Sequence, residues 1–146
     1  MAEAERHDVD VAVIGAGPAG LSAALNLVRA RRRVHLLDSN RPRHSATLVS
    51  HGFLTRDGVS PLELRRIGRE EVEGYASASV AQALVRSLVH DGDRFVLSAD
   101  GVRGAAAQEV TANAVLIASG LGETLPALPS MRAYYCLLYT SDAADE

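Results

Sequence analysis

The amino-acid sequence predicts an α/β fold, in which a parallel sheet carries a small antiparallel meander and the domain is incomplete. Three observations predict it. A short apolar run, residues 8–14, ends at a glycine-rich turn. Apolar residues at helical spacing follow that turn. A second apolar run then ends in an acidic residue, Asp38. This order of strand, glycine turn, helix and acid-ended strand is typical of a nucleotide-binding βαβ unit.

The composition indicates one globular domain, or part of one. The chain has 146 residues, of which 47% are hydrophobic and 23% charged, and a formal net charge of -3. Its arginines are spread along the chain without forming a basic stripe, which argues against a nucleic-acid partner. The first apolar run is too short for a signal peptide, and no run approaches the roughly 20 apolar residues of a membrane helix. We therefore expect a cytoplasmic protein with no membrane partner.

The first βα unit is predicted from residues 8–14, DVDVAVI, because a short β-branched apolar run is typical of a buried parallel strand. The turn Gly15–Gly20 follows this strand. Pro18 suits the first turn of the next helix, where its missing N–H is no loss. The apolar side of that helix is predicted from the 3.6-residue spacing of Leu21, Ala24, Leu25 and Val28.

The second predicted strand is Val34–Asp38, and the long connection Asn40–Gly58 separates it from a second helix. This helix is charged on most of its faces, so we expect it on the surface. Its N-cap, first position, capping-box position and end are predicted at Ser60, Pro61, Glu63 and about Gly74.

The pattern after this helix changes toward strands. Apolar and β-branched runs alternate with glycine-containing turns, which is typical of an antiparallel excursion from a parallel sheet followed by a returning strand. The predicted strands are 77–80, 83–90, 94–99, 108–112 and 115–118.

The strongest chemical signal is the G-x-G-x-x-G motif of Gly15, Gly17 and Gly20. Gly15 permits a tight turn, Gly17 allows the backbone to approach a pyrophosphate, and Gly20 allows helix and strand to pack closely. The pyrophosphate would then lie at the helix N-terminus, where free N–H groups face it. Asp38 would accept hydrogen bonds from the adenosine ribose, and its charge argues against a 2′-phosphate at this site. The alternative is a glycine-rich turn without a ligand.

A second motif, VLIASG, covers Val115–Gly120 and is an apolar strand that ends in small residues. In isolation it indicates a core strand that enters a turn. Given the upstream glycine motif, it also fits a strand end that returns to the cofactor.

From Asp8 to about Tyr135, the chain resembles the N-terminal part of the thioredoxin-reductase-like flavoproteins, within the two-dinucleotide-binding-domain superfamily. The matching segments are VAVIGAGPAGLSAAL, VHLLD, RPRH, SHGFLTRDG, VLIASG and LPALPSMRAYY. The resemblance implies a Rossmann-like FAD-binding domain, whose N-terminal part is residues 1–135. The cofactor-binding residues that it implies are Gly15, Gly17, Pro18, Ala19, Gly20, Asp38, Arg43, His51, Ala118, Ser119 and Gly120.

The activity implied by this resemblance is that of an FAD-dependent pyridine-nucleotide oxidoreductase. Hydride would pass from NAD(P)H to FAD and then to a disulfide, or a dithiol would be oxidised in the reverse direction. A small-molecule or disulfide substrate and a homodimer are open for the full-length protein. We identify no catalytic residue and expect no metal site. The loop that holds Arg43, His44 and His51 is implied to run near the flavin, and for both histidines the alternative is an ordinary solvated loop residue. For the whole chain the alternatives are a flavin monooxygenase or other FAD oxidoreductase, and a truncated fragment without activity.

The last eleven residues, 136–146 (CLLYTSDAADE), resemble the translation of a sequencing adaptor, and we expect a non-native tail there. A native, mildly acidic C-terminus is the alternative. The segment holds Cys136, which is the chain's one cysteine, and Leu137, Leu138 and Tyr139 do not supply a partner for a Cys-x-x-Cys pair. Without the segment, acidic and basic residues are equal in number.

Overall fold

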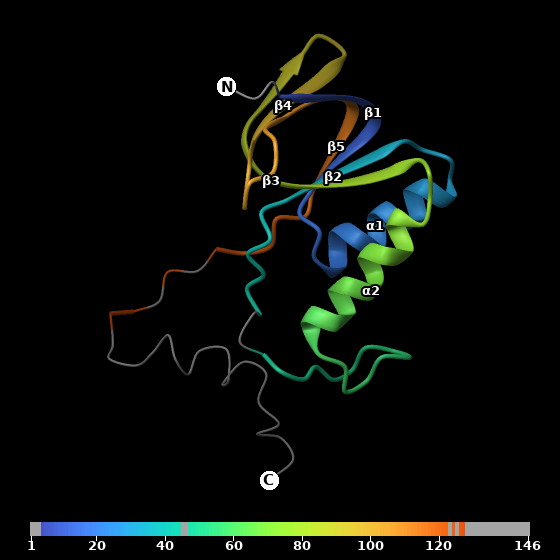
Figure 1. Ribbon diagram of the computed structural model, residues 1–146, viewed down its shortest axis with the longest axis vertical. Helices are drawn as coiled ribbons and strands as arrows, with labels where there is room; N and C mark the ends of the chain where they lie inside the picture. Colours follow the sequence, from blue (N-terminus) through green and yellow to red (C-terminus); the bar gives the residue numbers. More distant parts are fainter. Residues whose placement is uncertain (1–3, 45–46, 123, 125, 128–146) are drawn as a thin grey trace.

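The computed structural model describes residues 4–44, 47–122, 124 and 126–127, so the expected tail, 136–146, lies outside the described residues. Within them, five strands and two helices form one mixed α/β fold (Figure 1). In chain order they are β1 (Glu5–Ile14), α1 (Pro18–Arg29), β2 (Val34–Asp38), α2 (Pro61–Glu73), β3 (Ala78–Asp91), β4 (Arg94–Gly101) and β5 (Gln108–Ile117).

The sheet combines a parallel part with an antiparallel meander, as the sequence predicts. β1 pairs in parallel with both β2 and β5, and β2 pairs in parallel with β3. β4 pairs antiparallel with β3 on one side and with β5 on the other, which closes the sheet on itself. Figure 1 shows both helices on the same side of this sheet. The carboxyl ends of β1, β2 and β5 therefore meet at one edge, because parallel strands point the same way.

Two of the predicted strand boundaries are wrong, because four predicted strands are two continuous ones. β3 runs through the expected break near Gln82, and β5 runs through the expected break near Asn113. The first part of β3, residues 78–82, pairs with β2, and the rest pairs with β4. A strand that changes partner without reversing its direction has no turn residue to mark the change.

The sheet has an apolar cluster on each of its faces, because successive side chains of a strand point to opposite sides. Val13 and Leu36 face the helices and pack with Leu21, Ala24 and Val72. On the other face, inside the ring of strands, the cluster is formed by Val9, Ala12, Leu37, Ala83, Leu97, Ala99, Val110 and Ala112. Leu36 and Leu37 are consecutive residues of β2 that point to opposite faces, and both are at most 1% exposed, so β2 is buried on both sides.

The second helix, α2, begins as predicted. The Ser60 hydroxyl accepts a hydrogen bond from the Glu63 N–H at 3.1 Å, and Pro61 occupies the first turn. The Glu63 carboxylate binds Arg66 at 2.7 and 2.8 Å, however, rather than serving as the second half of a capping box. The charged side of α2 is exposed, but Pro61 and Val72 are buried and Arg65 is turned inward, so the helix is only partly the surface element that its charges suggest. No helix in the described part of the chain is long and apolar enough to span a bilayer.

Candidate cofactor-binding site

The glycine turn between β1 and α1 is fixed by backbone packing at two of its three glycines. Gly15 has a φ of 102°, which favours glycine, and a β-carbon there would overlap the carbonyl oxygen of Ala118. A β-carbon on Gly20 would overlap the carbonyl oxygen of Gly15. Gly15 and Gly20 are therefore required by the protein's own backbone, in the roles that the motif predicts.

Gly17 differs from the other two glycines. It is the N-cap of α1, and no described atom lies within 4 Å of a β-carbon built on it. No described side chain caps this helix, and its first turn holds no acidic residue. By contrast, Ser60 caps α2. The first N–H groups of a helix need partners, so the open end of α1 is suited to an anionic group.

Hydrogen bonds hold the glycine turn against the two neighbouring strand ends. The Gly15 N–H donates to Leu37 O at 2.8 Å, and the Ala118 N–H donates to Ile14 O at 2.8 Å. These bonds bring the turn, the end of β2 and the segment after β5 to one place. Gly120, with a φ of 74°, then turns the chain after β5.

A cleft of about 530 Å³ opens at this edge of the sheet. Nine of the predicted cofactor-binding residues line it, namely Gly15, Gly17, Pro18, Ala19, Asp38, Arg43, Ala118, Ser119 and Gly120. Gly20 packs behind the turn instead, and His51 does not line the cleft. The lining also includes Arg41, His44 and Arg65, which are not among the predicted cofactor-binding residues. The two glycine-containing motifs, about a hundred positions apart, thus contribute to one site.

Asp38 lies at the centre of a polar network that the sequence did not reveal. Its Oδ1 accepts the Ala16 N–H at 3.3 Å, and its Oδ2 forms an ion pair with the Arg65 guanidinium of α2. The two side chains are only 10% and 14% exposed. The sequence around Arg65 carries no local signal for this pair, since the partners are 27 positions apart.

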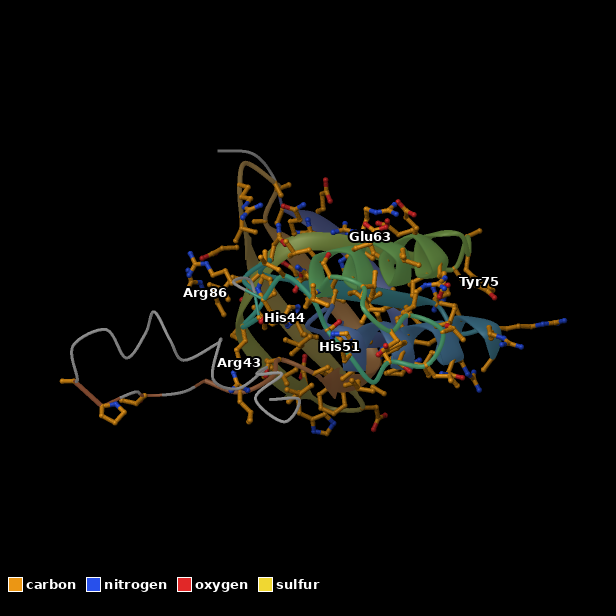
Figure 2. The ribbon with its side chains drawn as sticks, turned by 90° about the horizontal axis from the view of Figure 1, so that it is seen from below. Arg43, His44, His51, Glu63, Tyr75 and Arg86 are labelled. Carbon is orange, nitrogen blue, oxygen red and sulfur yellow. The ribbon has the colours of Figure 1, made fainter. Side chains whose placement is uncertain are left out.

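The loop after β2 brings further nitrogen-bearing side chains to the cleft. Figure 2 shows Arg43, His44 and His51 along this loop, of which Arg43 and His44 line the cleft. Burial, and then the charge of Arg65, lower the pKa of His44. A neutral imidazole is therefore the favoured form of His44 near neutral pH.

His51 lies farther along the same loop, away from the cleft. Its Nδ1 is 3.4 Å from Asp57, and the Gly52 N–H donates to the same carboxylate at 2.8 Å. These contacts form a small surface turn in which the His51 side chain is 55% exposed. The prediction that His51 binds the cofactor stays a prediction. Within the described residues, no group of three or more His, Cys, Asp or Glu is placed to hold a metal ion.

Comparison with known proteins gives a consistent set of relatives. The family model described as pyridine nucleotide-disulphide oxidoreductase matches residues 9–146. A probable thioredoxin reductase of Arthroderma benhamiae is 35% identical over 130 residues, or 86% of this chain. The crystal structure of a Bacillus anthracis protein assigned as thioredoxin reductase TrxB is 40% identical over 86% of this chain, with a TM-score of 0.78. That of an oxidoreductase from Agrobacterium tumefaciens is 33% identical over 86% of this chain, with a TM-score of 0.77.

The chain spans only part of these relatives. It covers 31% of the Arthroderma benhamiae protein, and 41% of each of the two solved chains. The similarity therefore concerns one portion of each of these longer relatives.

Proposed function

Since the chain belongs to the pyridine nucleotide-disulphide oxidoreductase family, we propose that its cleft binds the adenosine diphosphate half of FAD. The whole protein would be a thioredoxin-reductase-like, FAD-dependent NAD(P)H oxidoreductase. Residues 1–135 would form the N-terminal part of its FAD-binding domain.

The contrast among the three motif glycines carries this proposal. Protein backbone fills the space beside Gly15 and Gly20, whereas the space beside Gly17 is open. An ordinary tight turn would need only Gly15 and Gly20. The open position lies at the uncapped N-terminus of α1, where N–H groups and the positive end of the helix dipole attract a pyrophosphate.

The remaining lining suits the rest of the nucleotide. Asp38 is at the end of β2, where an acidic residue hydrogen-bonds the ribose in this kind of fold. Ala118, Ser119 and Gly120 contribute small side chains from the other strand end, so a large ligand can approach the backbone there. Arg43 lines the cleft beside His44 and adds positive charge near the expected phosphates.

When bound, FAD supplies the two-electron chemistry, accepting hydride from NAD(P)H and passing electrons to a disulfide, or the reverse. The part of this chain is to bind and orient the nucleotide. We assign no catalytic residue to it. The relatives named thioredoxin reductase support a disulfide substrate, and a flavin monooxygenase using the same fold remains the competing enzyme class.

A retention experiment tests the proposal. The purified 146-residue chain is incubated with FAD, with FMN or with NAD⁺, desalted, and examined by flavin absorbance or nucleotide content. We expect FAD to be retained and to be displaced by excess ADP. FMN lacks the adenosine monophosphate part of FAD, including the adenosine that the cleft would hold, so it should pass through. A chain that retains no FAD, or retains FMN equally well, contradicts the proposal.

A further inference from the structure

Arg65 makes three separate polar contacts at the adenosine end of the cleft. Its Nε donates to Ala16 O at 3.1 Å, and its Nη1 donates to Asn40 Oδ1 at 3.2 Å. Its Nη2 forms the ion pair with Asp38 Oδ2. One guanidinium from α2 thus joins the glycine turn, the end of β2 and the loop that follows it.

Asp38 is consequently held by both of its oxygens. Oδ1 accepts the Ala16 N–H, and Oδ2 accepts from Arg65. A carboxylate has about four acceptor positions, two on each oxygen. One position on each oxygen therefore remains, on a side chain that lines the cleft.

We propose that Arg65 is a positioning residue for ribose recognition, because it fixes Asp38 so that each carboxylate oxygen can accept a hydrogen bond from one ribose hydroxyl. This inference rests on the proposed function. Without Arg65, Asp38 keeps its charge but loses the contact that sets the direction of its Oδ2. Under this proposal, recognition of the ribose depends on α2, a helix outside the glycine motif.

The geometry explains why this residue is an arginine. Three nitrogens in one rigid plane contact three acceptors on three different segments. A lysine has a single nitrogen on a flexible chain, so it would keep the charge but could not hold all three acceptors in place. Arg66, the next residue, binds Glu63 and Glu70 on the exposed side of the same helix and offers a matched control.

The test compares binding of ADP with binding of 2′,3′-dideoxy-ADP, which lacks both ribose hydroxyls, by calorimetry on the full chain. Hydrogen bonds to a charged acceptor are strong enough that we expect the original chain to prefer ADP by about tenfold or more. Arg65→Gln and Arg65→Lys should both reduce this preference toward equal binding. Arg66→Gln should keep it. Asp38→Asn should lose it, and adding Arg65→Gln to Asp38→Asn should change it no further.

The outcomes separate the two claims. If Arg65→Gln weakens both ligands equally, or only lowers the melting temperature, Arg65 is merely structural and the inference is wrong. The same conclusion follows if the original chain binds both ligands equally, while the cofactor site itself still stands. If the original chain binds neither ADP nor FAD, the proposed function fails and takes this inference with it.

Discussion

The carbonyl oxygen of Gly15 occupies the space that a β-carbon on Gly20 would need. These two residues bracket Gly17, whose own β-carbon position is open. The same motif therefore contains two glycines, Gly15 and Gly20, that are needed to fold the turn and a third, Gly17, that is needed only when something occupies the cleft. Stability and binding should respond to different substitutions within six residues of chain.

Gly17→Ala and Gly20→Ala form a matched pair that tests this division. We expect Gly20→Ala to lower the free energy of unfolding by about 1–3 kcal/mol or more, because the backbone of α1 must move away from the carbonyl of Gly15 in the glycine turn. Gly17→Ala should cost less than about 1 kcal/mol, since alanine tolerates the observed φ of -80° and only the N-cap preference is lost. It should nevertheless weaken FAD binding by roughly tenfold or more, because its methyl group takes the pyrophosphate's place.

Urea unfolding and FAD titration of the two variants check this prediction. If Gly17→Ala loses as much stability as Gly20→Ala, the space beside Gly17 is not open in solution. If it binds FAD as well as the original chain, the pyrophosphate does not lie at this helix end.

Ser60→Ala should destabilise α2 selectively. The Ser60 hydroxyl caps the Glu63 N–H at 3.1 Å, and losing such a cap typically costs about 1 kcal/mol. Ser22→Ala is the control, because Ser22 is an exposed residue inside α1 and should have almost no effect. Urea unfolding measures both changes. An equal loss for the two serines would show that the cap contributes nothing beyond removal of a hydroxyl.

The local parts of the fold could be predicted from the sequence. The glycine turn, the acid-ended β2 and the start of α2 at Ser60 all depend on residues within a few positions of one another. Each has a physical signature that a short segment carries by itself, such as a left-handed φ or a capping hydroxyl. Most of the candidate site could be predicted for the same reason, because it is built where two such short segments, the glycine turn and the end of β2, meet.

The parts that could not be predicted depend on partners far away in the chain. Arg65 looked like one more charge on a surface helix, and its contact with Asp38 exists only after α2 packs beside α1. Similarly, β3 exchanges its partner β2 for β4 near Gln82, and nothing local separates that exchange from the end of a strand. Periodicity reports which side is buried, but it does not report what covers that side.

Leu97→Ala should be the most damaging truncation on β4. Leu97 is 0% exposed inside the ring of strands, and removing a buried leucine side chain typically costs about 2–5 kcal/mol. Leu54 is 88% exposed, so Leu54→Ala is the matched control and should change stability by less than about 0.5 kcal/mol. Thermal and urea unfolding would measure both. A small loss at Leu97 would mean that the antiparallel strands do not close over this core.

His35 should make stability fall in acid. It is 1% exposed on β2, its Nδ1 lies 2.7 Å from Ser79 Oγ, and its ring stacks on His7 with centroids 3.9 Å apart. Burial, followed by the charge of His7, lowers the pKa of His35 to about 4, although Gln108 and Glu5 act in the opposite direction. The unfolded chain binds a proton at the ordinary histidine pKa of about 6.5, well before the folded chain does. Stability should therefore fall as the pH drops from about 6.5 to about 4, by about 3 kcal/mol in total.

His35→Phe isolates this contribution, because phenylalanine keeps an aromatic ring against His7 and cannot be protonated. Carboxylates such as Asp10, whose pKa the Arg33 N–H lowers, also destabilise the fold in acid, but they do so equally in both proteins. The difference in unfolding free energy between the two chains should thus shrink, or reverse, between about pH 7 and about pH 4. Urea unfolding at several pH values measures that difference. A difference that stays constant over this range would mean that His35 is as easily protonated in the folded protein as in the unfolded chain.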